Sequence, residues 1–253
     1  MIYFCIIEWI EDIKTKLTAS GIGFIETEPY LLELEGKNRS VDLYLLNTGD
    51  SFSGRIEKCI LLHEDIFRAR KNHVIQRLVS LLGLIQNRIH GRQIKIHKID
   101  RLTGRQFIND NHLLSDGGGS IYLGLFSTNN LVGVASFSKP LFMKHEEPAY
   151  YSSVLIRFCT LSHTTVVGGL DKVIQYYLRT YQPNDIITFV DREWSTGLTY
   201  ETIGFECIGQ TEPLTFIISN GERTVLGKDA AANEKQIIIR NHGNLKFQLK
   251  CAK

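Results

Sequence analysis

Residues 157–191 read RFCTLSHTTVVGGLDKVIQYYLRTYQPNDIITFVD, and this stretch decides the fold class. It begins in a strand-like segment (154–159) and passes through a loop of small residues. It then continues into an amphipathic helix predicted over 168–180. Gln182-Pro183 ends the helix, and residues 185–190 form a second apolar strand. A helix between two strands, with hairpins on either side, predicts an α+β fold with a mixed sheet.

The flanking sequence supplies those hairpins. Residues 120–125 and 131–137 are apolar runs separated by the turn sequence STNN, and QIKIHKI before them alternates as a strand. Residues 205–209 and 214–219 predict a second hairpin, KDAAANEKQIIIR predicts a helix, and LKFQL near the end of the chain predicts a last strand. A short helix is expected over 103–109 and another over 199–203.

The first 90 residues predict a separate, small α/β unit. Apolar spacing predicts helices over 8–19 and 63–84, and strands over 24–35, 40–46 and 56–62 lie between them. We therefore expect two domains, residues 1–90 and residues 91–253. The first is small enough to depend on its neighbour for stability.

Composition narrows the class of protein. The chain has 253 residues, of which 43% are hydrophobic and 22% charged, as in an ordinary globular protein. No apolar run approaches the length of a transmembrane helix, and the start MIYFCIIEWIEDIK lacks the basic leader of a signal peptide. The five cysteines contain no CxxC pair, which favours reduced thiols in a cytoplasmic protein. Because no apolar run is long enough to span a membrane, we expect no membrane partner.

A net charge of +2 conceals a basic block at residues 66–105. It holds ten Lys or Arg side chains against one carboxylate, Asp100, and only one aromatic residue. Such a block suits contact with the phosphates of duplex DNA better than base stacking on single strands, although a solvated helix face is the simpler alternative. The residues we expect to bind DNA are Arg68, Arg70, Lys71, Arg77, Arg88, Arg92, Lys95 and Lys98.

Two features of the second half carry possible chemistry. The loop with Gly168 and Gly169 leads into a helix, whose first backbone amides can hold an anion, although a tight packing turn is also consistent with it. Asp191 ends a strand and Tyr200 follows a polar loop, so they are candidates for a base and an acid. The alternative is that Asp191 caps the next turn and Tyr200 packs in the core.

Residues 93–219 resemble the C-terminal domain of phage homing-endonuclease-like proteins. The segments that carry the resemblance are LGLFSTNNLVGVASFSKP, LIRFC and VVGGLDKVIQYYLRTYQPNDIITFVDREWSTGLTYETIGF. That domain is similar to the Mom family of phage DNA-modification proteins, which has the fold of GCN5-related N-acetyltransferases (GNAT). The resemblance implies an acyl-CoA donor held by Thr164, Thr165, Val166, Val167, Gly168 and Gly169. It implies a catalytic site of His112 in NDNHLL, Arg157 in RFC, Asp191 in FVDREW and Tyr200 in TGLTYETIGF.

The first 90 residues resemble the nuclease half of the same phage proteins, which is similar to very-short-patch-repair (Vsr-type) endonucleases. Glu8 and Asp42 match acidic positions that hold a catalytic Mg²⁺ there. The family carries a long acidic insert where this chain has only NTGDSFSGR, between Leu46 and Ile56. Because a metal needs several converging ligands, we expect this nuclease centre to be degenerate.

Three hypotheses follow from the sequence. The first is a DNA-binding protein related to homing endonucleases, whose nuclease centre is degenerate. The second is a Mom-like acyltransferase that modifies a DNA base, and the third is an active Mg²⁺-dependent endonuclease. Double-stranded DNA is the expected partner in all three, and a role through a host protein partner stays open.

Overall fold

The computed structural model describes residues 2–54, 56, 59–144, 149–219, 222–227 and 236–251. The chain forms two compact units, and neither is one continuous segment. The first unit contains Met1–Leu84, Val190–Thr196 and Gln210–Leu245, and the second contains Ile85–Phe189, Gly197–Gly209 and Lys246–Lys253. The sequence predicted two consecutive segments that meet at residue 90, whereas two later segments belong to the first unit.

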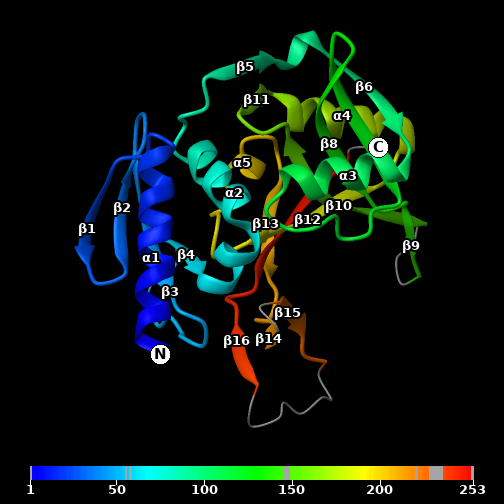
Figure 1. Ribbon diagram of the computed structural model, residues 1–253. Helices are drawn as coiled ribbons and strands as arrows, with labels where there is room; N and C mark the ends of the chain where they lie inside the picture. Colours follow the sequence, from blue (N-terminus) through cyan, green and yellow to red (C-terminus); the bar gives the residue numbers. More distant parts are fainter. Residues whose placement is uncertain are drawn as a thin grey trace. The chain divides into compact units, whose positions relative to one another are not determined.

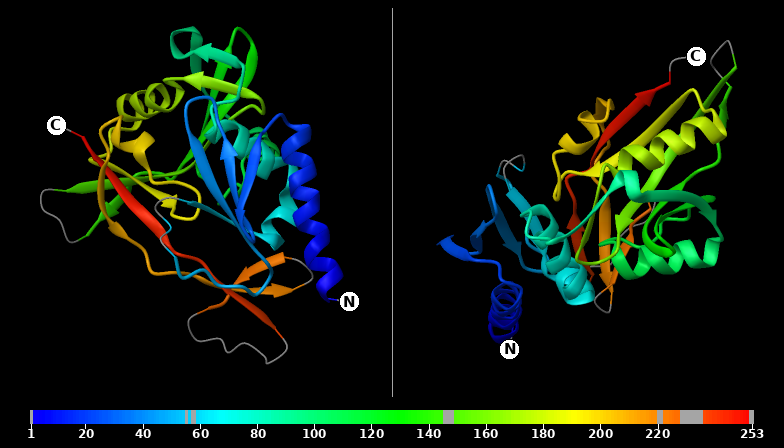
Figure 2. Two further views of the ribbon diagram at one scale, coloured as in Figure 1. Left: turned by 90° about the vertical axis from the view of Figure 1, so that its left-hand side faces the viewer. Right: turned by 90° about the horizontal axis from the view of Figure 1, so that it is seen from above.

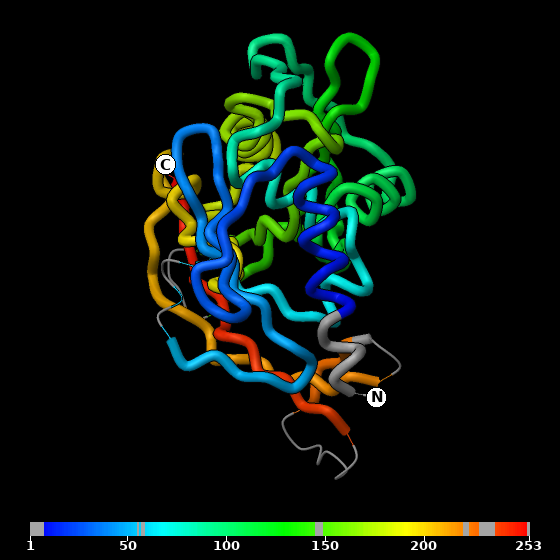
Figure 3. Tube along the Cα trace, turned by 60° about the vertical axis from the view of Figure 1, so that its left-hand side comes forward, coloured from blue at the N-terminus to red at the C-terminus, as the bar shows by residue number. Residues whose placement is uncertain are grey.

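The first unit contains a four-stranded sheet and two long helices, and Figure 3 traces the path of the chain through it. The strands lie in the order β1-β2-β3-β4, antiparallel except for the parallel pair β3 and β4. Helix α1 contacts helix α2, and the Trp9 and Phe67 rings lie 6.0 Å apart between them. The elements are α1 (Ile2–Ala19), β1 (Phe24–Glu28), β2 (Leu31–Glu35), β3 (Ser40–Leu46), β4 (Cys59–His63) and α2 (Glu64–Leu81).

The later segments add a three-stranded sheet to the first unit. Its order is β15-β14-β16, with β14 (Thr215–Ser219), β15 (Glu222–Val225) and β16 (Ile237–Arg240) all antiparallel. The helix predicted over KDAAANEKQIIIR is therefore wrong at its end, because consecutive β-branched isoleucines favour a strand there. The rest of that prediction, residues 228–235, lies outside the described residues.

The second unit is built on an eight-stranded mixed sheet (Figure 1). Its order is β13-β17-β12-β10-β8-β7-β6, and β9 pairs with β10. The strands are β6 (Ile94–Ile99), β7 (Ile121–Ser127), β8 (Asn130–Phe137), β9 (Leu141–Met143), β10 (Tyr150–Thr160), β12 (Asp185–Asp191), β13 (Glu206–Gln210) and β17 (Asn244–Lys250). A separate two-stranded parallel sheet joins β5 (Asn87–His90) and β11 (Thr164–Val167).

Two helices cover opposite faces of the eight-stranded sheet (Figure 2). On one face, Ile108 of α3 (Arg101–Asn111) packs with Tyr122 and Val134. On the other, the Tyr177 ring of α4 (Gly169–Tyr181) stacks on Phe137 at 4.0 Å. Alternate residues of a strand point to opposite faces, so apolar side chains at consecutive positions of β7 and β8 support both helices. Short elements α5 (Leu198–Glu201) and the 3-10 turn η2 (Gly91–Gln93) complete the unit.

The mixed α+β class expected from the sequence is confirmed, with two corrections to strand pairing. Residues 24–35 are not one strand but a hairpin, β1 and β2, which turns at Pro29 and Tyr30. Residues 205–209 and 214–219 do not pair as a hairpin, because β13 joins β17 and β14 joins β15 and β16. Neither the nuclease-like nature of the first unit nor the GNAT-like nature of the second follows from these pairings, and both stay predictions.

No helix among the described residues is long and apolar enough to span a membrane. No disulfide joins the cysteines whose side chains the structure describes, in agreement with the expected reduced thiols.

Candidate functional site

The centre of the second unit is the parallel pair β10 and β12, with α4 in the crossover between them (Figure 1). In the described chain their register runs only from Ser152 opposite Asp185 to Leu155 opposite Thr188. Strand β10 bulges between Leu155 and Arg157 in its pairing with β8, and then continues to Thr160. Because β10 leaves its parallel neighbour at the bulge, backbone groups beyond Leu155 do not pair with β12.

Helix α4 begins at this end of the pair without a side-chain cap. Its N-cap is Gly168, whose φ of 71° is in the left-handed region that glycine adopts at least cost. The backbone N–H of Lys172 donates to the Gly168 carbonyl, so the amides of the preceding helical residues have no partner within the helix. Amides at a helix start, together with the helix dipole, attract anions in general, and anion binding at this helix stays a prediction.

The predicted donor-binding loop is mostly a strand. Thr164, Thr165, Val166 and Val167 form β11, which pairs in parallel with β5, and only Gly168 and Gly169 remain at the helix start. Thr164 is buried, and its hydroxyl accepts a hydrogen bond from the Asn87 side-chain amide at 3.0 Å. A Cβ on Gly169 would lie 2.7 Å from Val166 Cγ1, so this glycine permits close packing. The packing interpretation of the glycine pair therefore applies to Gly169, and the anion-binding interpretation stays a prediction for Gly168.

Basic side chains lie beside this helix end. Arg88 of β5 pairs in register with Thr165, and Arg92 is in η2. The Lys172 ammonium holds η2 against α4 by donating to the carbonyls of Gly91 at 2.8 Å and Ile94 at 2.5 Å. Positive charge next to an uncapped helix start strengthens its attraction for phosphate.

Arg157 lies on β10 immediately after the bulge. Its Nε donates to the Ser115 carbonyl at 3.0 Å and its Nη1 to the Ile156 carbonyl at 2.8 Å, so the guanidinium is held in one orientation. Burial lowers the pKa of Arg157, and the charges of Asp116 and Tyr200 partly oppose that change. The structure therefore brings two of the predicted catalytic residues, Arg157 and Tyr200, into electrostatic range of each other.

Asp116 is a polar residue of this region that the sequence analysis missed. It is 4% exposed, its carboxylate accepts the Tyr122 hydroxyl at 2.8 and 2.9 Å, and the Arg105 guanidinium lies 3.7 Å away. The signal in the sequence was DGGG at 116–119, because consecutive glycines allow a tight turn that can bring the preceding carboxylate against the core. Burial and the neighbouring Asp116 raise the pKa of Tyr122.

His112 and Tyr200 have mainly structural contacts. His112 ends α3, and its Nδ1 engages the backbone of Leu114, whose N–H lies 2.9 Å away. The Tyr200 ring packs against Phe205 and Phe247, with centroids 5.5 and 5.9 Å apart. Tyr200 thus packs, as the alternative interpretation of the sequence had it, and its role in catalysis stays a prediction.

Asp191 belongs to the first unit, with a cluster of buried polar groups. Its Oδ1 accepts the backbone N–H of Glu193 at 2.9 Å, which caps the turn that follows β12. The Glu193 carboxylate lies 3.3 Å from His63 Nε2 and 2.9 Å from His242 Nδ1. Burial and repulsion by Glu193 raise the pKa of Asp191 to about 6. An acid–base role for Asp191 stays a prediction, whereas its capping role is visible.

The predicted magnesium site has no support in the described residues. Glu8 is exposed on α1, and Asp42 is on β3, where it pairs in register with Glu33 and Cys59. Across the part of the chain that the structure describes, no group of three or more His, Cys, Asp or Glu side chains could hold a metal ion. The two carboxylates were proposed from the resemblance alone, and no other ligand joins them.

The basic block divides between the two units. On α2, Arg68 pairs with Glu64 at 2.8 Å and Lys71 with Asp12 at 2.6 Å, so part of its charge is already neutralised. Arg70 and Arg77 lie half-buried on the same helix. In the second unit, the predicted DNA-binding side chains are all exposed, namely Arg88, Arg92, Lys95 and Lys98.

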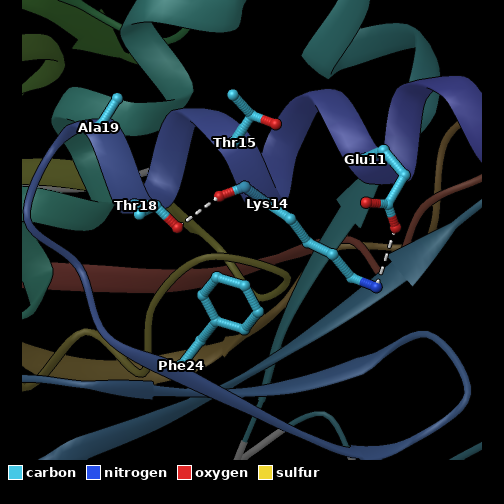
Figure 4. A pocket seen from close by; sticks show the side chains of 6 residues that line it. All are labelled: Glu11, Lys14, Thr15, Thr18, Ala19 and Phe24. Atoms are coloured by element: carbon cyan, nitrogen blue, oxygen red, sulfur yellow. Dashed lines mark hydrogen bonds and ion pairs between the residues drawn. The ribbon is translucent and has the colours of Figure 1, made fainter.

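A hollow of about 550 Å³ lies on the first unit, between α1 and the start of β1 (Figure 4). Its one amine, Lys14, contacts the carboxylates of Glu11 at 3.2 Å and Glu26 at 2.8 Å. The Thr18 hydroxyl donates to the Lys14 carbonyl at 3.1 Å. Because its one amine is already paired with two carboxylates, this hollow offers an anionic ligand little to bind.

No protein-family model matches the chain, and no curated protein matches it in sequence. Several solved acetyltransferase structures are similar to it in shape. A GNAT family acetyltransferase from Elizabethkingia anophelis, with acetyl-CoA bound, has a TM-score of 0.41 and 14% identity, over 63% of this chain and 99% of that chain. An Arabidopsis thaliana protein in complex with a CoA-containing bisubstrate analogue has a TM-score of 0.39 and 11% identity, over 63% and 99%.

A spermidine N-acetyltransferase from Vibrio cholerae is similar at a TM-score of 0.39 and 12% identity, over 63% of this chain and 94% of that chain. At TM-scores below 0.5, these likenesses carry no argument about what this chain does. Proposals for its function therefore rest on its own strands, helix ends and side chains.

Proposed function

We propose that the second unit is an acyl-CoA-dependent transferase of the GNAT type. The observation that carries the proposal is the uncapped start of α4 at Gly168, beside a parallel strand pair that separates after Leu155. The amides of the helix start suit the diphosphate of CoA. The backbone groups of β10 beyond the bulge suit the amide-bearing arm that carries the thioester.

The reaction is acyl transfer to a nucleophile of the acceptor. A nitrogen lone pair attacks the thioester carbon, the carbon–sulfur bond breaks, and the CoA thiolate leaves and takes up a proton. The acylated nitrogen gives up one proton, which returns to the acid that protonated the thiolate. In this proposal Arg157, fixed by the Ser115 and Ile156 carbonyls, orients the acceptor, and the Tyr200 hydroxyl supplies the proton.

Calorimetric titration of the full chain with CoA tests the donor site. We expect binding that weakens at least tenfold in Val167→Glu, because a carboxylate beside Gly168 repels the diphosphate. Val167 is 37% exposed, so the substitution leaves the core intact. Val167→Gln is the matched neutral control and should bind as the wild type does. Absence of binding to the wild type, or equal affinity in both variants, would overturn the proposal.

A second function, binding of duplex DNA, is favoured by the basic side chains of β5, η2 and β6. Arg88, Arg92 and Lys95 are exposed and, among the described residues, take part in no ion pair with a carboxylate. This supports the expected DNA partner, and a base of the duplex would then carry the acceptor nitrogen. The relation to homing endonucleases remains a proposal that rests on the sequence resemblance.

Gel retardation of a long duplex across a salt series tests DNA binding. We expect retarded, intact DNA that salt releases, and a salt slope smaller by about one unit for each of Arg92→Gln and Lys95→Gln. Lys71→Gln is the control, because Lys71 is already paired with Asp12. Salt-independent retardation would count against these side chains. Cleavage that needs Mg²⁺ would instead restore the nuclease hypothesis with Glu8 and Asp42.

A further inference from the structure

A second hollow, of about 590 Å³, lies in the second unit beside the carboxyl end of α4. It is distinct from the helix start considered above, because a helix of the length of α4 separates its two ends by about 20 Å. The side chains that matter for a ligand are Lys98, Ser120, Lys139, Tyr151, Tyr181 and Gln182.

The hollow is positively charged. Lys98 is on β6 and Lys139 follows β8, so the two ammonium groups flank the start of β7, the strand between them. Among the residues that the structure describes, no carboxylate lines the hollow and neither lysine forms an ion pair with a carboxylate. Unlike Lys14 in the hollow of the first unit, these two amines can bind an anionic ligand.

Its aromatic wall is rigid. The Phe137, Tyr177 and Tyr181 rings form a column, with successive centroids 4.0 and 4.7 Å apart. The Tyr177 hydroxyl fixes the middle ring by donating to the Ser138 carbonyl at 2.8 Å, and Tyr181 ends the column at the hollow. Tyr151 also lines the hollow, and two hydrogen bonds of 2.7 and 2.8 Å between its backbone and Asn184 hold it in place.

We propose that this hollow binds a nucleoside phosphate, with the base against the tyrosine rings and the phosphate between Lys98 and Lys139. Flat aromatic rings on a rigid wall favour stacking of a base, and two unpaired ammonium groups favour a phosphate. The geometry also sets the orientation of the nucleotide in the hollow. The carboxyl end of α4 carries partial negative charge, so it attracts the amino groups of a base and repels the phosphate.

Calorimetric titration of the full chain with 5′-AMP and with adenosine tests the site. We expect 5′-AMP to bind at least tenfold more tightly than adenosine. Lys139→Met should reduce the affinity for 5′-AMP to that for adenosine, and Tyr181→Leu should weaken both. Lys139 is exposed, so its variant tests the site even if Tyr181→Leu impairs folding. Lys250→Met, which removes an exposed lysine elsewhere, is the matched control.

A competition with CoA separates this proposal from the proposed transferase. CoA contains an adenine nucleotide, so 5′-AMP could bind at the helix start instead. We expect saturating CoA to leave the affinity for 5′-AMP unchanged, and Val167→Glu to leave it unchanged as well. Displacement of 5′-AMP by CoA together with full affinity in Lys139→Met would overturn the inference. Failure of CoA binding alone would leave it standing.

The same hollow would accept a free nucleotide or one nucleotide of a nucleic acid. A five-nucleotide oligo(dA) titrated in parallel distinguishes the two sources. Tighter binding of the oligonucleotide, lost in Lys139→Met, identifies a nucleic-acid strand, and equal or weaker binding identifies the free nucleotide. No binding of either probe at millimolar concentration would contradict the assignment.

Discussion

At the scale of single residues, the first unit contains a cluster of buried titratable side chains next to Asp191. His63 is 1% exposed and Glu193 is 2% exposed, and His242 contacts the same carboxylate. Interaction with both histidines lowers the pKa of Glu193 in spite of its burial, whereas burial raises that of Asp191. Folding therefore shifts the pKa values of these two neighbouring carboxyl groups in opposite directions.

The first prediction concerns the pH dependence of stability. The native state holds a proton on Asp191 up to a pH of about 6, whereas an unfolded aspartate loses it near 3.8. This contribution to stability is present below pH 4 and is lost as the pH rises through 6. From pH 4 to pH 7 the free energy of unfolding of the wild type, relative to Asp191→Asn, should fall by about 2 kcal/mol.

Urea unfolding at several pH values measures this difference. Asparagine keeps the Oδ1 that accepts the Glu193 N–H, so the variant isolates the titration from the capping bond. The two histidines lower the pKa of Glu193 in both proteins, so the comparison reports Asp191 together with its repulsion by Glu193. A difference that stays constant between pH 4 and pH 7 would show that Asp191 titrates normally in the native state.

At the scale of elements, the local pattern of residues 157–191 predicted the strand, helix and strand that form the centre of the second unit. It did not predict that Thr164–Val167 is a strand, because β11 exists only through its pairing with β5, which lies far away in sequence. The same limit explains why the pairing of β13 with β17 was missed. Local patterning indicates that a strand is present and says little about its partner.

The second prediction concerns the start of α4. Gly168 has a φ of 71°, and a Cβ added there meets no atom within 4 Å, so its substitution tests backbone conformation alone. We expect Gly168→Ala to reduce the free energy of unfolding by about 1 kcal/mol. Gly168→Asn should cost less, because asparagine adopts the left-handed region more readily. Equal losses in the two variants, measured by urea unfolding, would contradict this explanation.

At the scale of the whole molecule, the chain does not divide at one point. The first unit includes residues 190–196 and 210–245 as well as the N-terminal segment. Individual hydrogen bonds and an ion pair join these later residues to the N-terminal segment. The Leu61 N–H donates to the Glu193 carbonyl at 2.9 Å, and Arg223 pairs with the 5% exposed Asp65. Removing the partner of a buried charge is costly, so these bonds matter to stability.

The third prediction follows from that division. A fragment of residues 1–90, the domain expected from the sequence, lacks Glu193 and Arg223 and exposes the surfaces they cover. We expect it to show no cooperative unfolding transition in circular dichroism, while the full chain unfolds cooperatively. In the full chain, Arg223→Gln should reduce the stability by about 3 kcal/mol or more. A fragment that unfolds cooperatively would show that the later segments are dispensable.

By itself, the sequence determined the α+β class, the order of most helices and strands, and the position of the helix start at Gly168, because each depends on periodicity and glycine within a few residues. Only the tertiary structure decided which strands pair, and that Asp116 lies near Arg157 and Glu193 between His63 and His242. It also decided that Lys98 and Lys139 flank one strand beside a column of rings. These groups are distant in sequence, and local patterns do not record which distant residues the burial of apolar surface brings together.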